Sequence, residues 1–229
     1  MQTTNMIVYV ISYVMVFLLS WISKINKNER LFNDDGDITQ KPGNLLGIHL
    51  TGILWLGLVP VIQLNLAVIQ VLFGNKVPET LALSTFAFVY LFAIILAGRL
   101  GQNVRRSGIN SPDKLMQIPA AFFFRYYIIR ASYLFVYELW FRGFLLFESI
   151  NRFGTPAAVV INVFLYSLLH VFKNKKELLA CIPFGLILCF FSIWFNAALP
   201  AIILHISFSL VYELKIYRNN FINCKTVQS

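Results

Sequence analysis

The chain has 229 residues, of which 58% are hydrophobic and 13% are charged, and its mean hydropathy is +0.70. This composition excludes a soluble globular domain, because several apolar runs are long enough to cross a bilayer. The net charge of +9 would suit a nucleic-acid-binding protein, but Lys and Arg gather in the loops between apolar runs. We therefore predict an all-α polytopic membrane bundle, a single domain over residues 1–229, that contacts the lipid bilayer and binds no nucleic acid.

Seven apolar segments are predicted to cross the membrane. The fourth is too long for a simple span, so we expect its start, with Arg125 and Arg130, to lie along the membrane interface. The seven segments are residues 6–22, 45–73 with a bend at Pro60, 81–98, 119–150, 157–172, 177–195 and 198–217.

The basic residues predict how the chain is oriented. If the Ser23–Asn44 loop is cytoplasmic, the opposite side carries only Lys76 and Arg152. By the positive-inside rule, the N-terminus is then outside and the C-terminus cytoplasmic. The compact chain is typical of a bacterial plasma-membrane protein. The cytoplasmic side would hold Lys24, Lys27, Arg30, Lys41, Arg99, Arg105, Arg106, Lys114, Lys173, Lys175, Lys176, Lys215, Arg218 and Lys225.

Four ionisable residues, Glu138, Arg142, His170 and His205, interrupt the long apolar stretches. A charged side chain at the bilayer centre costs roughly 2.5–3.5 kcal/mol on insertion scales, so such residues indicate function. Glu138 and Arg142 are four residues apart, which places their side chains on one helix face. Other polar residues are expected at the edges of the spans: His49 at the interface, and Glu148 and Glu213 in solvent.

The predicted depths of these residues agree. At a rise of 1.5 Å per residue, Glu138, His170 and Ser209 each lie about 20 Å below the outer turns, with His205 one turn above Ser209. Tyr166 and His170 share the spacing of four residues, as do His205 and Ser209. The sequence therefore predicts that three helices present polar groups to one cavity, nearer the cytoplasmic face.

Three motifs in this region resemble a known family. Residues 137–143, YELWFRG, match the second Glu, the Arg and the Gly of a Glu-Glu-x-x-x-Arg motif, and residues 166–170, YSLLH, match an aromatic followed three residues later by His. Residues 205–209, HISFS, match His-x-x-x-Asn with Ser in the last place. In this order they resemble the membrane-embedded CaaX-prenyl-endopeptidase and bacteriocin-processing (CPBP or Abi) proteases, across about 120–215.

The resemblance implies a membrane endopeptidase acting on membrane-delivered peptides or lipidated proteins, including prenylated CaaX-type tails. Residues 119–217 would be the catalytic core, and the spans in 1–118 carry no motif. Peptide hydrolysis needs an activated water, a donor for the oxyanion and a proton for the leaving amine. The resemblance assigns the water to Glu138 and His170 and the oxyanion to His205 and Ser209. Supporting roles fall to Arg142, Tyr137 and Tyr166.

One position departs from the family pattern. Tyr137 stands where the family has its first Glu, and a phenol, with an unperturbed pKa near 10, is a poor base at neutral pH. The alternative is therefore a catalytically impaired immunity or scaffold protein. A small transporter or proton relay would also use buried Glu and His, although no inverted repeat supports it.

We expect no cofactor to be required. Zinc is the alternative, because carboxylate and imidazole groups are zinc ligands. Its ligands would be Glu138, His170 and His205.

Overall fold

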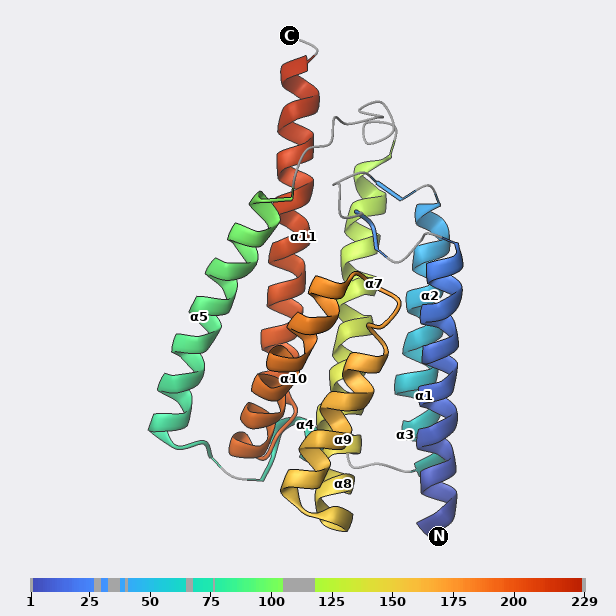
Figure 1. Ribbon diagram of the computed structural model, residues 1–229, viewed down its shortest axis with the longest axis vertical. Helices are drawn as coiled ribbons and strands as arrows, with labels where there is room; N and C mark the ends of the chain where they lie inside the picture. Colours follow the sequence, from blue (N-terminus) through green and yellow to red (C-terminus); the bar gives the residue numbers. More distant parts are fainter. Residues whose placement is uncertain are drawn as a thin grey trace.

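The computed structural model describes residues 2–26, 30–32, 38–39, 41–64, 68–75, 77–104 and 118–227. Apart from an isolated bridge between Phe32 and Ile38, the regular elements of this part are helices, which run alongside one another with the chain termini at opposite ends (Figure 1). The predicted all-α bundle is confirmed. The elements are α1 (Gln2–Ile25), α2 (Pro42–Ile53), the π-helical turn η1 (Leu54–Leu58), α3 (Val59–Leu64), α4 (Val68–Phe73), α5 (Thr80–Gln102), α7 (Ala120–Glu138), the π-helical turn η2 (Leu139–Leu145), α8 (Leu146–Phe153), α9 (Thr155–Leu168), α10 (Lys175–Phe195) and α11 (Leu199–Val227).

Five described helices are long and apolar enough to cross a membrane, so the chain is an integral membrane protein. The α9 helix is apolar but has only 14 residues, a rise of about 21 Å. The prediction of seven crossings stays a prediction. The five are Ile7–Ile25, Pro42–Ile62, Thr80–Gln102, Lys175–Phe195 and Leu199–Asn219.

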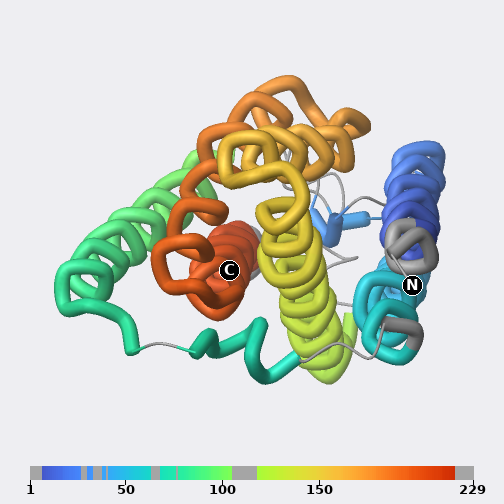
Figure 2. The backbone as a smooth tube through the Cα atoms, turned by 90° about the horizontal axis from the view of Figure 1, so that it is seen from below, coloured from blue at the N-terminus to red at the C-terminus, as the bar shows by residue number. Residues whose placement is uncertain are grey.

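The prediction that residues 45–73 form one membrane span is wrong. The helical run from α2 through α3 ends at Leu64, and α4 is a separate short helix along one end of the bundle (Figure 2). There the Val71 carbonyl accepts a hydrogen bond from the Ala198 amide, 2.9 Å away, so α4 supports the start of α11. The run changes geometry at the π-helical turn from Leu54, ahead of Pro60.

The fourth predicted segment does not begin along the interface. Residues 120–153 form one continuous helical run, α7–η2–α8, in which α7 follows the axis of the bundle (Figure 1). Arg130 lies inside, its side chain 14% exposed, and pairs with Glu213. Glu213 and His49 are also buried, which corrects the solvent-exposed position expected for Glu213. The interfacial depth expected for His49 stays a prediction. Arg125 is exposed, and the Glu148 carboxylate pairs with Arg152.

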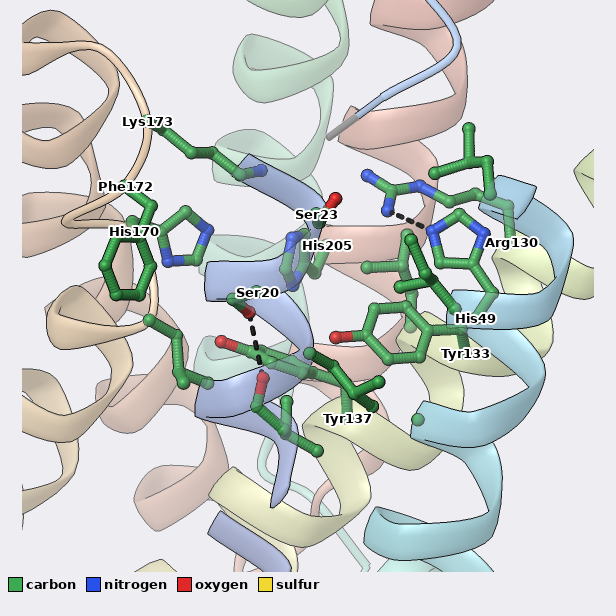
Figure 3. Close-up of a pocket in the computed structure, with 17 residues that line it drawn as sticks. Ser20, Ser23, His49, Arg130, Tyr133, Tyr137, His170, Phe172, Lys173 and His205 are labelled. Atoms are coloured by element: carbon green, nitrogen blue, oxygen red, sulfur yellow. Dashed lines mark hydrogen bonds between the residues drawn. The ribbon is translucent and has the colours of Figure 1, made fainter. Parts of the chain in front are cut away.

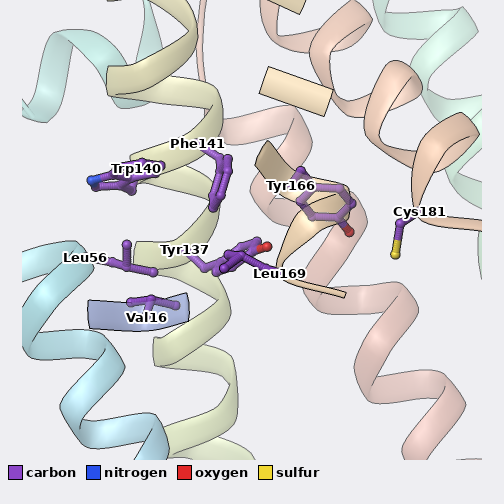
Figure 4. Packing of buried hydrophobic residues seen from close by; sticks show 8 residues of the cluster. All are labelled: Val16, Leu56, Tyr137, Trp140, Phe141, Tyr166, Leu169 and Cys181. Carbon is purple, nitrogen blue, oxygen red and sulfur yellow. The ribbon is translucent and has the colours of Figure 1, made fainter. Parts of the chain in front are cut away.

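The hydrophobic core nearest the motifs surrounds the junction of α7 and η2. Gly52 and Gly57 let the α2–η1 run approach α7, since a methyl group on Gly57 would lie 2.9 Å from Val136. Tyr137 and Tyr166 pack edge to face inside this core, with ring centroids 5.9 Å apart (Figure 4). The buried members are Val16, Leu56, Tyr137, Trp140, Phe141, Tyr166, Leu169 and Cys181.

Described basic residues gather at the end of the bundle where α1 and α5 finish. Lys24 and Arg99 lie in the last turns of those helices, whereas Arg152 ends α8 at the opposite end (Figure 1). The separated termini agree with an odd number of crossings; the side each faces stays a prediction. Several loop residues used for that prediction lie outside the described residues: Lys27, Lys76, Arg105, Arg106 and Lys114.

Candidate active site

Glu138 and His205 form a direct pair between α7 and α11. Glu138 is fully buried, and its Oε1 lies 2.6 Å from His205 Nδ1. An ionised carboxylate only accepts hydrogen bonds, so Nδ1 carries the proton and donates it. The other ring nitrogen, Nε2, is then an acceptor. The carboxylate thus fixes both the tautomer and the orientation of the imidazole.

Arg142 balances the buried charge of Glu138. Its Nε lies 3.5 Å from Glu138 Oε2, and neither side chain is exposed. The guanidinium also sits 4.5 Å from the centre of the Tyr166 ring, a cation–π contact. Together with His205 these residues form what we call the Glu138 cluster: Glu138, Arg142 and His205. The predicted pairing of Glu138 with Arg142 is present.

A π-helical turn supports this cluster. In η2 the Leu146 amide donates to the Phe141 carbonyl five residues back. The buried Asn162 amide of α9 donates to the same carbonyl at 2.6 Å, and its Oδ1 accepts a hydrogen bond from the Cys189 thiol. Such turns are often found at functional sites. Sequence reasoning missed Asn162, although an amide inside an apolar helix is itself a signal of interhelical bonding.

His170 lies in the turn after α9, because the helix ends at Leu168 and does not continue to residue 172 as predicted. Its Nδ1 is 3.0 Å from the carbonyl oxygen of Tyr166. A carbonyl only accepts, so Nδ1–H donates and Nε2 again remains an acceptor. Tyr166 therefore positions His170 through its backbone and Arg142 through its ring.

A cavity of about 90 Å³ lies between α1, α2, α7, α11 and the turn after α9 (Figure 3). All three histidines of the chain line it: His49, His170 and His205. Tyr137 also lines it, and the buried Tyr137 hydroxyl has no hydrogen-bonding partner among the described residues. Glu138 does not line the cavity and lies behind His205.

Ser209 lies away from this cavity. Its hydroxyl accepts a hydrogen bond from an Arg130 NH2 group at 3.3 Å, and it is not a lining residue. His205, rather than Ser209, is therefore level with Glu138. The predicted depth of α11 is wrong by about one helical turn.

Ser209 belongs to a second polar group, which sequence reasoning did not identify. Arg130 NH1 lies 3.1 Å from His49 Nε2, and Arg130 Nε lies 3.4 Å from Glu213 Oε1. The Tyr126 hydroxyl donates to Glu213 Oε2 at 2.8 Å. We call these five residues the Arg130 cluster: Arg130, Glu213, His49, Tyr126 and Ser209.

The residues named as zinc ligands are not gathered into one ligand set in the described part of the chain. Across the described ranges, no group of three or more His, Cys, Asp and Glu side chains is placed to hold a metal ion. Glu138 and His205 instead contact each other directly through a hydrogen bond, and His170 bonds a backbone carbonyl.

Comparison with known proteins places the motifs in a family. Residues 117–211 match the family model described as type II CAAX prenyl endopeptidase Rce1-like. The match includes all three motifs and confirms the resemblance to the CPBP proteases. At the family level it supports a membrane endopeptidase of the CAAX type. No curated protein and no solved structure matches the chain.

Proposed function

We propose that this chain, whose residues 117–211 match the Rce1-like family, is a membrane-embedded endopeptidase in which His205 activates the attacking water. The observation that carries the proposal is the 2.6 Å hydrogen bond from His205 Nδ1 to the buried Glu138 carboxylate. A carboxylate that holds an imidazole in one tautomer, with Nε2 as acceptor, is the arrangement that serine hydrolases use to make histidine a base. Here the nucleophile would be water.

The proposed reaction begins with a water in the cavity. His205 Nε2 takes one proton from it, while His170 Nε2 accepts a hydrogen bond from the other O–H and holds the oxygen in place. The water oxygen bonds the scissile carbonyl carbon, and the carbonyl oxygen becomes an oxyanion. The protonated His205 then gives its proton to the leaving nitrogen as the C–N bond breaks, which restores the neutral imidazole.

Tyr137 is proposed to stabilise the oxyanion. Its hydroxyl is buried and without a described partner, and its residue lines the same cavity as His205. A preorganised donor aimed at developing negative charge is worth far more in a dry site than in water. This role needs a hydroxyl donor rather than a base, so it explains how a member with Tyr in place of the first Glu could still turn over.

This proposal changes two roles inferred from the resemblance. Glu138 orients His205 instead of touching the water, because it lies behind the imidazole and does not line the cavity. Ser209 bonds Arg130 and leaves oxyanion stabilisation to Tyr137. Arg142 balances the charge of the Glu138 carboxylate by pairing with it inside the bundle.

The second candidate is a non-catalytic protein that binds membrane-delivered peptides. The observation that favours it is Tyr137 at the position of the family's first Glu. Without the family's first carboxylate to act on water, such a site would bind a peptide without cleaving it. Its substrate or partner class would be the same lipidated peptide.

The test uses the purified protein in liposomes with membrane-anchored peptides and mass spectrometry of the products. The variants are His205→Ala, Glu138→Gln, Tyr137→Phe and Tyr137→Glu. Glu148→Gln is the matched control, because Glu148 lies on the same helical run but pairs with Arg152 outside the cavity.

Cleavage by the wild type that is lost in His205→Ala and Glu138→Gln, reduced in Tyr137→Phe and kept in Glu148→Gln supports the endopeptidase. Loss of one oxyanion donor is expected to lower kcat by about 10²–10³-fold. If the wild type is silent and Tyr137→Glu cleaves, the second candidate is correct. Full activity of Glu138→Gln would contradict the proposed role of the pair.

A further inference from the structure

Two tyrosines on neighbouring turns of α7 line the cavity. Tyr133 and Tyr137 are four residues apart, so their rings lie on one face of the helix, with centroids 5.8 Å apart. Figure 3 shows the Tyr133 hydroxyl pointing into the space that Tyr137 and His205 also border. The proposed reaction uses the hydroxyl of Tyr137 and leaves that of Tyr133 without a role.

The Tyr133 hydroxyl is free to donate a hydrogen bond. It forms none within the described part of the chain, and the same holds for the buried Tyr137 hydroxyl. The three histidines, the two cations and the two serines of the lining each interact with another residue of the chain. The two phenols are therefore the polar side chains of this wall that no described residue engages.

Gly52 of α2 fixes the position of the Tyr133 ring. A methyl group on Gly52 would lie 2.4 Å from Tyr133 Cε2, so the ring occupies the space that a side chain at this position would fill. The ring also packs against the imidazole of His49, with centroids 5.0 Å apart. These contacts hold the ring without using its hydroxyl, so the donor is in place before a substrate enters. Such preorganisation makes a donor effective, because nothing has to reorient as charge develops.

We propose that Tyr133 is a second catalytic donor, which shares with Tyr137 the oxyanion formed at the scissile carbonyl. The inference rests on the proposed function, because it adds a residue to the same reaction. As the water oxygen bonds the carbonyl carbon, the π electrons of the C=O bond move to its oxygen, and each phenol O–H donates one hydrogen bond to that oxygen. Both protons stay on the phenols, and the hydrogen bonds weaken when the carbonyl forms again and the amine leaves.

The other polar residues leave this second position unfilled. An oxyanion accepts more than one hydrogen bond, and the serine hydrolases use two donors for it. Ser209, to which the family resemblance assigns the task, is bonded by Arg130 and does not line the cavity. His205 bonds a carboxylate through one ring nitrogen and acts on the water through the other. Tyr133 lines the cavity on the same helix face as the first donor.

The test measures hydrolysis of a membrane-anchored peptide in liposomes by the wild type and by Tyr133→Phe, which removes the hydroxyl and keeps the ring that packs on Gly52. A phosphinate analogue of the same peptide, in which a tetrahedral phosphorus with a negatively charged oxygen replaces the scissile amide, serves as an inhibitor. Tyr127→Phe is the matched control. The Tyr127 hydroxyl is also buried without a described partner, but Tyr127 does not line the cavity.

We expect Tyr133→Phe to lower kcat by about 10²-fold, the low end of the loss for one oxyanion donor, and to change KM by less than about threefold. The inhibition constant of the phosphinate should rise by about the factor by which kcat/KM falls, because a donor to the oxyanion bonds the transition state and its analogue alike. Tyr127→Phe should keep the wild-type kcat and inhibition constant within about twofold.

Gly52→Ala tests the position of the hydroxyl rather than its presence. The added methyl group displaces the Tyr133 ring, so kcat should fall in the wild type and fall no further in the Tyr133→Phe background. An equal loss in both backgrounds would show that Gly52 does not act through the hydroxyl and would count against the proposal. Thermal unfolding shows whether each variant is folded, and if Gly52→Ala is not, Tyr133→Phe carries the test.

The outcomes separate this inference from the proposed function. Wild-type kcat in Tyr133→Phe, with Tyr137→Phe impaired, would overturn the inference and leave the endopeptidase intact. A rise in KM alone, or a loss of kcat with unchanged inhibition by the phosphinate, would make Tyr133 a residue that holds the peptide and would also overturn it. If the wild type cleaves no peptide, the proposed function fails and this inference fails with it.

Discussion

In the Glu138 cluster the imidazole bonds the carboxylate, whereas in the Arg130 cluster it bonds the guanidinium. His205 donates from Nδ1 to Glu138, so its Nε2 acceptor remains available. His49 uses its Nε2 lone pair to accept from Arg130. Both groups contain Arg, Glu and His inside the same bundle, and both histidines line the same cavity. Of these two histidines, only His205 keeps its Nε2 lone pair available to take a proton.

The two clusters contain the same residue types, so their chemistry differs because of the side chain that each histidine bonds. A histidine bonded to a carboxylate is strengthened as a base, because the carboxylate stabilises the imidazolium that forms. A histidine bonded to a guanidinium faces a positive charge, which opposes its protonation. The Glu138 cluster therefore suits proton transfer, and the Arg130 cluster suits holding a neutral imidazole.

The comparison is tested most strongly by removing each histidine. We expect His205→Ala to lower kcat for peptide cleavage by about 10²–10⁴-fold, the usual contribution of a general base. His49→Ala should lower it by less than about tenfold, because the Nε2 of His49 is already engaged. Both are measured by product formation in liposomes. Equal losses in the two variants would contradict the distinction drawn between the clusters.

The next largest effect concerns the buried charge pair. Glu138→Gln leaves the Arg142 guanidinium buried and uncompensated, which should lower the free energy of unfolding by about 3–5 kcal/mol. Adding Arg142→Met should recover most of this loss without restoring cleavage. Titration with a denaturing detergent in mixed micelles measures both. A double variant no more stable than Glu138→Gln would show that the two charges are not coupled.

A smaller effect is expected where α9 holds the π-helical turn. Asn162→Ala removes the 2.6 Å hydrogen bond to the Phe141 carbonyl, but the Leu146 amide still bonds that oxygen. We expect a loss of about 1–2 kcal/mol in unfolding free energy and a measurable fall in kcat. Asn162→Asp would be a poor control because it adds a buried charge. Asn162→Gln, which keeps the amide, should be intermediate.

The smallest expected effect lies in the Arg130 cluster. Tyr126→Phe deletes the hydroxyl that bonds Glu213, while Arg130 remains as the partner of that carboxylate. Hydrogen bonds between membrane helices are worth about 0.6 kcal/mol on average, so a loss of about 1 kcal/mol is expected. Cleavage should be unchanged within about twofold. A loss of activity as large as that in His205→Ala would place Tyr126 in the reaction.

The sequence predicted the contacts that one helix or one motif determines. Glu138 and Arg142 are four residues apart, so helix geometry alone places them together. The motif order correctly indicated that His205 lies near Glu138. The pairing of Arg130 with Glu213 could not be predicted in this way, because the residues are 83 positions apart and their meeting depends on how α7 and α11 are rotated.

The depth estimate for α11 failed because it treated the turns at Asn151 and Asn196 as lying at one level. The hydrogen bond between His205 and Glu138 shows that these two residues share a level instead, and Ser209 lies one helical turn further along α11, beside Arg130. The residues of α4 are as apolar as those of a membrane span, so hydropathy could not separate them from the preceding helix. Their position depends on the contact between Val71 and Ala198, a tertiary interaction.

Because every histidine of the chain lines one cavity, the histidine side chains can serve as spectroscopic probes of that cavity. The chain has three imidazoles, and all three line that space. Isotope labelling of histidine alone would therefore give resonances that report only on the cavity, with no background from the rest of the bundle. The Nδ1 and Nε2 signals distinguish an imidazole that donates to a carboxylate from one that accepts from a guanidinium. The contacts described for His205 and His49 could thus be read directly in a bilayer.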